Sequence, residues 1–295
     1  MENDQFTELA LPYQAPWQWQ QFHSHFALRA LKGVESLQAN RYSRSFHIDG
    51  TDGWFSVAPS AEAPALILRV SPGSEACIPA LTQRVRKMFD LDANPALINQ
   101  HLSADTTLAP LLARNPGLRL PTAFDPFEQA VRAIVGQQVT VKAAVTVTGR
   151  LVERLGRPLS GPSTPGVERL FPTAAAIVAA DLQGIGMPGK RVETLQNFAR
   201  EIASGNLQLS MQLGYQALVE RLCALPGIGP WTAEYIALRA FGEPDAFPDS
   251  DLGLLKAPVW GNDGIKAKQL KLLAEAWRPW RAYAAAHLWE NYSGA

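Results

Sequence analysis

The chain has 295 residues, a length that accommodates two or three domains. Its 27 basic and 27 acidic side chains cancel, which excludes a strongly cationic, histone-like protein but not a local face that binds nucleic acid. Two cysteines, Cys77 and Cys223, are too few for a disulfide framework, a four-thiolate zinc site or an iron–sulfur cluster. No apolar run approaches the roughly 18 residues of a membrane span, and the acidic N-terminus is unlike a signal peptide. We therefore expect a cytoplasmic protein.

Strand patterns are confined to the first hundred residues. Residues 41–48 alternate between apolar and polar side chains, and the Asp-Gly pairs at 49–50 and 52–53 predict a turn after them. Two further strands are predicted over residues 54–57 and 65–70, with helices over 25–37 and 75–89. This mixture predicts a small α+β domain with an antiparallel sheet.

Helical spacing dominates after residue 90. Apolar residues three and four positions apart predict helices over residues 127–135, 139–155, 190–204, 212–224, 232–241, 266–277 and 280–292. Residues 156–165 are rich in Pro, Gly and Ser, which predicts a surface loop. The last two-thirds of the chain is therefore expected to be mainly helical.

A Leu-Pro-Gly-Ile-Gly-Pro-Trp segment at residues 225–231 lies between two of these helices. Pro230 suits the first position of a helix, where its missing N–H would have no partner. Gly227 and Gly229 allow a sharp turn and a close approach to another surface. The next helix then presents N–H groups and its positive dipole end, which can hold a phosphate. An ordinary turn between packed helices is the alternative, but the full pattern favours an anion site.

At this hairpin the chain resembles the helix-hairpin-helix DNA glycosylase superfamily and, within it, the DNA-3-methyladenine glycosylase II family of bacteria. The resemblance covers about residues 15–292, and further matching stretches are 117–121, 127–129, 131–137, 186–188, 280–283 and 287–289. It implies an α+β domain over residues 1–91 and a helical domain with the hairpin over 122–243. Residues 92–121 and 244–295 would form a second helical domain that carries the catalytic acid.

Two acids follow the hairpin, Asp249 and Asp251. A glycosylase extrudes its target base from the duplex, and cleavage of the bond to the sugar builds positive charge that a nearby carboxylate stabilises. By the family's spacing the catalytic residue is Asp251, twenty residues after Trp231, with Asp249 as the alternative. Asp251 could instead only cap a helix, although capping and catalysis are compatible.

Three aromatic residues are assigned to the base pocket. Trp231 and Tyr235 are four residues apart on one helix face, and Trp289 matches an aromatic pocket residue of the family. Electron-rich rings attract the cationic alkylated purines, whereas core packing is the alternative role for each ring. In bifunctional members of the superfamily, a lysine stands at the position of Trp231 and forms a Schiff base with the sugar. A tryptophan cannot form a Schiff base. The resemblance therefore implies hydrolysis without strand cleavage.

Two turns are assigned to DNA by the resemblance. Their residues are Gln137, Gln138, Gly227, Ile228 and Gly229. Gln138 would fill the gap left by the extruded nucleotide, in place of the apolar Leu of some members. Backbone carbonyls of Cys223, Leu225 and Ile228 would hold a structural monovalent cation. No cofactor is implied for the chemistry.

Two histidines and one cysteine are given no functional role. His23 and His25 are two residues apart, do not converge on a helix and have no third ligand nearby, so we expect them on the surface. Cys223 has no histidine beside it in sequence to activate it, which favours a buried small side chain over a nucleophile.

Together these observations favour a monofunctional glycosylase that flips alkylated bases of the 3-methyladenine type out of double-stranded DNA. Hydrolysis of the N-glycosidic bond would start base excision repair. Two alternatives stay open, a non-enzymatic helix-hairpin-helix DNA-binding protein and a bifunctional glycosylase/lyase for oxidised purines. Asp251 disfavours the first, because a carboxylate near DNA repels phosphate, and Trp231 disfavours the second. We expect a monomer with no membrane partner.

Overall fold

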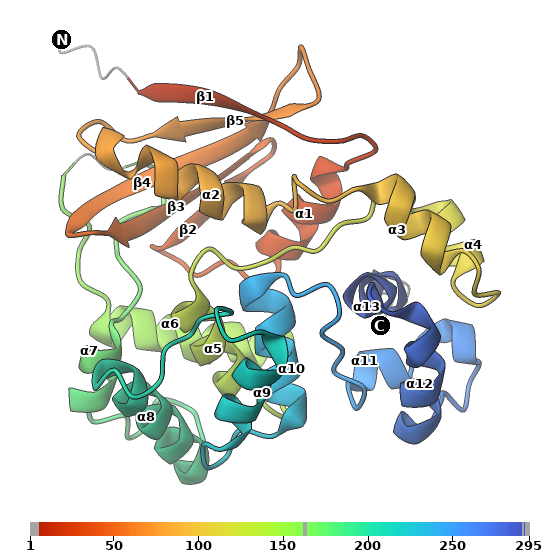
Figure 1. Cartoon of the computed structure of the whole chain (residues 1–295). Helices are drawn as coiled ribbons and strands as arrows, with labels where there is room; N and C mark the ends of the chain where they lie inside the picture. Colours follow the sequence, from red (N-terminus) through yellow and green to blue (C-terminus); the bar gives the residue numbers. More distant parts are fainter. Residues whose placement is uncertain (1–5, 162–163, 291, 293–295) are drawn as a thin grey trace.

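The computed structural model describes residues 6–161, 164–290 and 292 (Figure 1). The N-terminal part contains an antiparallel sheet with the strand order β1-β5-β4-β3-β2. Its strands are β1 (Thr7–Pro12), β2 (Glu35–Gln38), β3 (Arg41–Ile48), β4 (Thr51–Pro59) and β5 (Ala65–Val70). The predicted strands 41–48 and 65–70 are confirmed, and residues 54–57 form the middle of β4.

Helices α1 (Trp19–Ala27) and α2 (Ile78–Met88) cover one face of this sheet (Figure 1). Tyr42 of β3 lies opposite Val57 of β4, so both side chains point to the same face and into the same core. Phe22 and Phe26 lie one turn apart on α1 and are buried against this face. The predicted helix over residues 75–89 is confirmed as α2 with a short 3-10 turn, Glu75–Cys77, before it.

Two expectations for this region are wrong. The helix predicted over residues 25–37 ends as α1 at Ala27, and the chain passes Gly33 at a φ of 85° before it enters β2. A right-handed helix cannot continue through that conformation. The Asp52-Gly53 pair lies inside β4 rather than in a turn. A Cβ on Gly53 would come within 2.6 Å of the Phe46 ring, so glycine permits the strands to pack closely there.

Helices make up most of the rest of the chain and share an apolar core that extends from Ile98 to Leu288. They are α3 (Pro95–Leu102), α4 (Ala109–Arg114), α5 (Pro126–Val135), α6 (Val141–Leu155), α7 (Ala174–Ala179), α8 (Gly189–Ala203), α9 (Tyr215–Cys223), α10 (Pro230–Phe241), α11 (Leu252–Leu255), α12 (Ala267–Ala274) and α13 (Arg281–Glu290). Within the described residues, no helix is both long and apolar enough to cross a bilayer.

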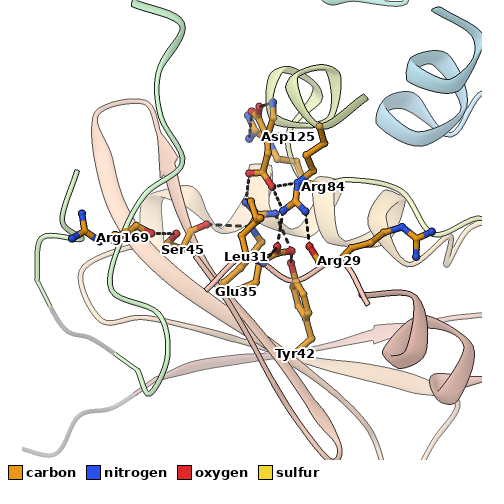
Figure 2. Close-up of polar contacts among 11 residues, drawn as sticks. Arg29, Leu31, Glu35, Tyr42, Ser45, Arg84, Asp125 and Arg169 are labelled. Atoms are coloured by element: carbon orange, nitrogen blue, oxygen red, sulfur yellow. Dashed lines mark hydrogen bonds and ion pairs between the residues drawn. The ribbon is translucent and has the colours of Figure 1, made fainter. Parts of the chain in front are cut away.

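A buried network of charges joins the sheet to α5, and Figure 2 shows the part of it around Glu35 and Tyr42. The guanidinium of Arg132 on α5 donates to Glu35 of β2 and to Glu128 of α5, each at 2.6 Å. Arg44 of β3 donates to the other oxygen of Glu128 at 2.7 Å. Each buried charge therefore has a partner, and loss of one would leave its neighbour uncompensated.

Asp90, which follows α2, connects the N-terminal part of the chain to helix α13. One of its carboxyl oxygens accepts hydrogen bonds from the Leu120 N–H at 3.0 Å and the Tyr283 hydroxyl, on α13, at 2.9 Å. Burial raises the pKa of Asp90 from 3.8 to about 6. Deprotonation therefore costs more in the folded chain than in the unfolded chain.

We expect Asp90→Asn to stabilise the protein more at pH 8 than at pH 5. Asn imitates the protonated acid, and the stability that wild-type Asp90 contributes in its protonated form is lost as the pH rises to about 6. The difference in free energy of unfolding between variant and wild type should grow by about 1 kcal/mol over this interval. Urea unfolding at both pH values measures it, and a difference that does not change with pH would contradict the prediction.

Candidate active site

A cavity of about 940 Å³ lies among helices α1, α5, α6, α10 and α13 and the start of α11. Its size falls in the range of ligand-binding clefts. The residues of the candidate catalytic group that line it are Trp231, Tyr235, Asp251 and Trp289. Segments that are far apart in the sequence thus meet around one space.

Asp251 lies at the centre of this group because three N–H groups hold its carboxylate. One oxygen accepts a hydrogen bond from the Trp231 indole at 3.0 Å. The other accepts from the Trp289 indole at 2.8 Å and from the Leu254 N–H at 3.2 Å, the latter as the N-cap of α11. Since a carboxylate has about four acceptor positions, it can accept one more contact in the cavity.

Asp249 has different surroundings. Its carboxylate forms an ion pair with Lys271, with 3.6 Å between Oδ2 and Nζ, and about a third of its side chain is exposed. Among the described residues that line the cavity, Asp251 is present and Asp249 is not. Of the two predicted acids, the structure therefore brings Asp251 together with the aromatic residues.

The aromatic rings form two sides of a corner. Trp231 and Tyr235 are stacked, with ring centroids 5.2 Å apart and an interplanar angle of 11°. Trp289 meets Tyr235 edge to face, at 6.3 Å and 79°. All three rings are partly exposed to the cavity rather than fully buried. They are therefore available to contact a planar ligand.

Arg239 belongs to the same wall, although the sequence reasoning missed it. It follows Tyr235 by four residues on α10, so that Trp231, Tyr235 and Arg239 form one stripe along the helix. Its guanidinium lies over the Trp289 ring, 4.8 Å from the centroid, and donates to the Pro121 carbonyl at 3.0 Å. Burial lowers the pKa of this arginine. The four-residue spacing from Tyr235 was the signal in the sequence that could have identified Arg239.

The hairpin between α9 and α10 is built around Gly227. Its φ is 83°, and a Cβ at this position would lie 2.0 Å from the Thr194 hydroxyl on α8. Ile228 is buried, and its N–H donates to the Leu225 carbonyl at 3.1 Å. Within the described chain, no group accepts a hydrogen bond from the N–H of Gly227 or Gly229. These two N–H groups, rather than that of Ile228, are free to bind an anion.

The two glutamines after α5 differ in their contacts. The side-chain amide of Gln137 donates to the Gly227 carbonyl and to the Thr232 hydroxyl, both at 3.0 Å, and so ties this turn to the hairpin. Gln138 is exposed, with a φ of 55°. Val139, beside it, is exposed and lines the cavity. The turn therefore presents a polar and an apolar side chain together.

The carbonyls expected to bind a cation lie at the same hairpin. Leu225 accepts one hydrogen bond through its carbonyl, which leaves a second lone pair, and carbonyl oxygens suit a hard monovalent ion. Among the described residues, no group of three or more His, Cys, Asp and Glu side chains could hold a metal. The carbonyls of Cys223, Leu225 and Ile228 fit the ion chemically, and their role stays a prediction.

The expectation that both histidines lie on the surface is wrong for His25. His25 lines the cavity, whereas His23 contacts the Gln38 carbonyl at 3.1 Å and is not among the lining residues. The expectation for Cys223 is consistent with its surroundings. This free thiol is partly buried, and burial raises its pKa, which disfavours the thiolate.

Glu234 is a further residue that the sequence did not reveal. One of its carboxyl oxygens accepts from the Tyr215 hydroxyl at 2.6 Å and from the Phe247 N–H at 2.9 Å. Tyr215 begins α9, and Phe247 lies in the segment that leads to Asp251. This carboxyl group therefore couples the hairpin to the loop that positions the candidate catalytic acid.

Comparison with known proteins agrees with this arrangement. Residues 8–125 match the AlkA N-terminal domain, and residues 131–281 match the HhH-GPD superfamily base excision DNA repair proteins. The chain is 35% identical, over 283 residues, to DNA-3-methyladenine glycosylase 2 of Escherichia coli, and the match covers 95% of each. The chain belongs to the HhH-GPD superfamily.

Other relatives are longer or more distant. The match to a probable bifunctional transcriptional activator/DNA repair enzyme AlkA of Mycobacterium tuberculosis has 36% identity, but the chain spans only 56% of that protein. The 3-methyladenine DNA-glycosylase of Archaeoglobus fulgidus has a similar structure, with a TM-score of 0.82, 23% identity and coverage of 96% and 97%. The structure of an 8-oxoguanine glycosylase/lyase of Clostridium acetobutylicum is also similar, with a TM-score of 0.72 and 19% identity. The match covers 99% of this chain and 100% of that one. These two likenesses establish the HhH-GPD fold alone.

We expect Gly227→Ala to destabilise the protein by about 2–4 kcal/mol, because the new Cβ would combine an unfavourable positive φ with a clash against Thr194. Thr194 cannot easily give way, since its hydroxyl donates to the Lys190 carbonyl at 3.0 Å. Gly229→Ala is the matched control, with a φ of −93° and no heavy atom within 4 Å of the added Cβ. Urea unfolding compares them, and equal stability of the two variants would refute the assigned role of Gly227.

Proposed function

We propose that this chain is a monofunctional DNA glycosylase. It would remove alkylated bases of the 3-methyladenine type from double-stranded DNA by hydrolysis of the N-glycosidic bond, as the first step of base excision repair. The observation that carries the proposal is the Asp251 carboxylate, held by two indole N–H groups within a cavity of an HhH-GPD chain. The similarity to DNA-3-methyladenine glycosylase 2 of E. coli supports the substrate class.

Each part of the proposed reaction has a group to perform it. The N–H groups of Gly227 and Gly229 would bind a phosphate of the damaged strand, while Gln138 would occupy the space that the extruded nucleotide leaves. The base would then lie against Trp231 and the other two rings. The free acceptor position of Asp251 would stabilise the positive charge on the sugar or orient the attacking water.

Two features support hydrolysis over lyase chemistry and over simple binding. A lyase needs an amine to attack the sugar, whereas Trp231 offers the acid only an indole N–H, which is not a nucleophile. A simple DNA-binding protein gains nothing from a carboxylate beside the phosphates.

We further propose that the protein acts as a cytoplasmic monomer. The free thiols of Cys77 and Cys223 are compatible with a reducing compartment.

We expect Asp251→Asn to lower base release from methylated duplex DNA by roughly 10³-fold, because the charge that stabilises the sugar cation is lost. The Asn oxygen can still cap α11, so the variant should fold and bind DNA with near wild-type affinity. Asp249→Asn is the matched control and should retain activity within a few-fold. Single-turnover release kinetics compare them. Loss of activity in Asp249→Asn alone would move the catalytic role to Asp249.

We also expect the strand to remain intact after base release. Duplex DNA treated with the enzyme should break at the abasic site only after alkali, because no lysine is among the described residues that line the cavity and could form a Schiff base. Denaturing electrophoresis with and without alkali measures this. Nicking without alkali, together with a complex trapped by borohydride, would instead identify a bifunctional lyase.

A further inference from the structure

One wall of the cavity comes from helix α1 of the N-terminal part rather than from the helices that hold Asp251. His25 on α1 and Arg29, just after the end of this helix, belong to this wall. Arg239 connects the two walls, because it lies over Trp289 and interacts electrostatically with both His25 and Asp251. His25 and the aromatic corner therefore line one and the same cavity.

The imidazole of His25 has no hydrogen-bonding partner among the described residues. The Arg29 side chain donates to the His25 carbonyl at 3.1 Å, so this contact uses the backbone and not the ring. The ring itself makes an edge-to-face contact with Phe26, with centroids 5.4 Å apart. The side chain is partly exposed, and neither ring nitrogen is buried without a partner. Its polar atoms are therefore open to a ligand in the cavity.

Positive charge surrounds this ring. Arg29, just after the end of α1, Arg132 on α5 and Arg239 on α10 each lower the pKa of His25. Burial, together with these three guanidinium groups, lowers the pKa of His25 well below its ordinary value of 6.5, so the ring is neutral at physiological pH. A neutral imidazole keeps one N–H donor and one acceptor nitrogen. Neither ring nitrogen has a partner among the described residues, so the N–H can lie on the nitrogen that faces the cavity.

We propose that His25 is a specificity-determining residue that donates a hydrogen bond to an exocyclic oxygen of the extruded base. This inference rests on the proposed glycosylase function. Among alkylated purines, 7-methylguanine carries an oxygen at the position where 3-methyladenine carries an amino group. Both lesions are cationic in DNA, but they also differ in the position of the methyl group and in the 2-amino group of guanine, so the test compares the ratio of their release between variant and wild type. The guanidinium groups of Arg29 and Arg239 in the same lining also favour the oxygen over the amino group.

The test measures release of both bases from one sample of methylated duplex DNA. The His25→Phe variant removes the donor but keeps a planar ring, and it should lower the ratio of 7-methylguanine to 3-methyladenine release by roughly five- to tenfold. In His25→Gln the amide keeps an N–H, so most of the wild-type ratio should return. His23→Phe is the matched control, since His23 is outside the lining, and it should leave the ratio unchanged.

The ratio separates specificity from folding, because the same folded molecules release both bases. Equal losses for the two bases in His25→Phe would make His25 a packing residue and refute the inference. A rise in the ratio, or no change, would refute it as well. If the wild-type protein releases neither base, the proposed function itself fails. Release of both by the wild type, with an unchanged ratio in His25→Phe, refutes the inference alone.

Discussion

A single carboxylate holds the candidate site together. Asp251 accepts hydrogen bonds from N–H groups of α10, α11 and α13, and these helices come from separate parts of the last third of the chain. Because Trp231 and Trp289 both direct their indoles at the acid, the rings and the carboxylate cannot be moved independently. The distance between a base held by the rings and the group that would act on its sugar is therefore built into the fold.

A second set of contacts links the sheet to the turn after α5 and to the hairpin between α9 and α10. The buried charges at Glu35 and Arg132 fix α5 against the sheet, and the turn with Gln137 follows directly after α5. Gln137 in turn binds the Gly227 carbonyl of the hairpin. Buried ion pairs contribute little net stability, because desolvation offsets most of their attraction. Their value here lies in position, since they fix where the sheet and the hairpin stand relative to each other.

Sequence reasoning succeeded where the signal was local. The alternation in β3, the hairpin glycines and the i,i+4 pair Trp231–Tyr235 each depend on neighbours within a few residues. Strands β1 and β2, which were missed, form the two edges of the sheet. Thr7 at the start of β1 pairs with Val70, and no local pattern announces a partner that distant.

The contacts of the polar residues in the site could not be predicted for a related reason. Nothing near His25 in the sequence indicates that Arg132 and Arg239 approach it from α5 and α10. The role of Gln137 likewise depends on a carbonyl ninety residues away. Only Arg239 could have been found, since it continues the stripe of Trp231 and Tyr235 by one helical turn.

The charges around the cavity bear on how damaged bases would be recognised. Asp251 and the electron-rich rings attract a cation, but Arg239 already lies over the Trp289 ring and opposes a second positive charge there. Binding alone then gives a cationic base only a limited advantage over a neutral one. On the proposed function, selection must therefore depend strongly on the bond that breaks, because an alkylated purine leaves its sugar more readily than a normal base. Contacts such as that of His25 would adjust the choice among bases that already leave readily.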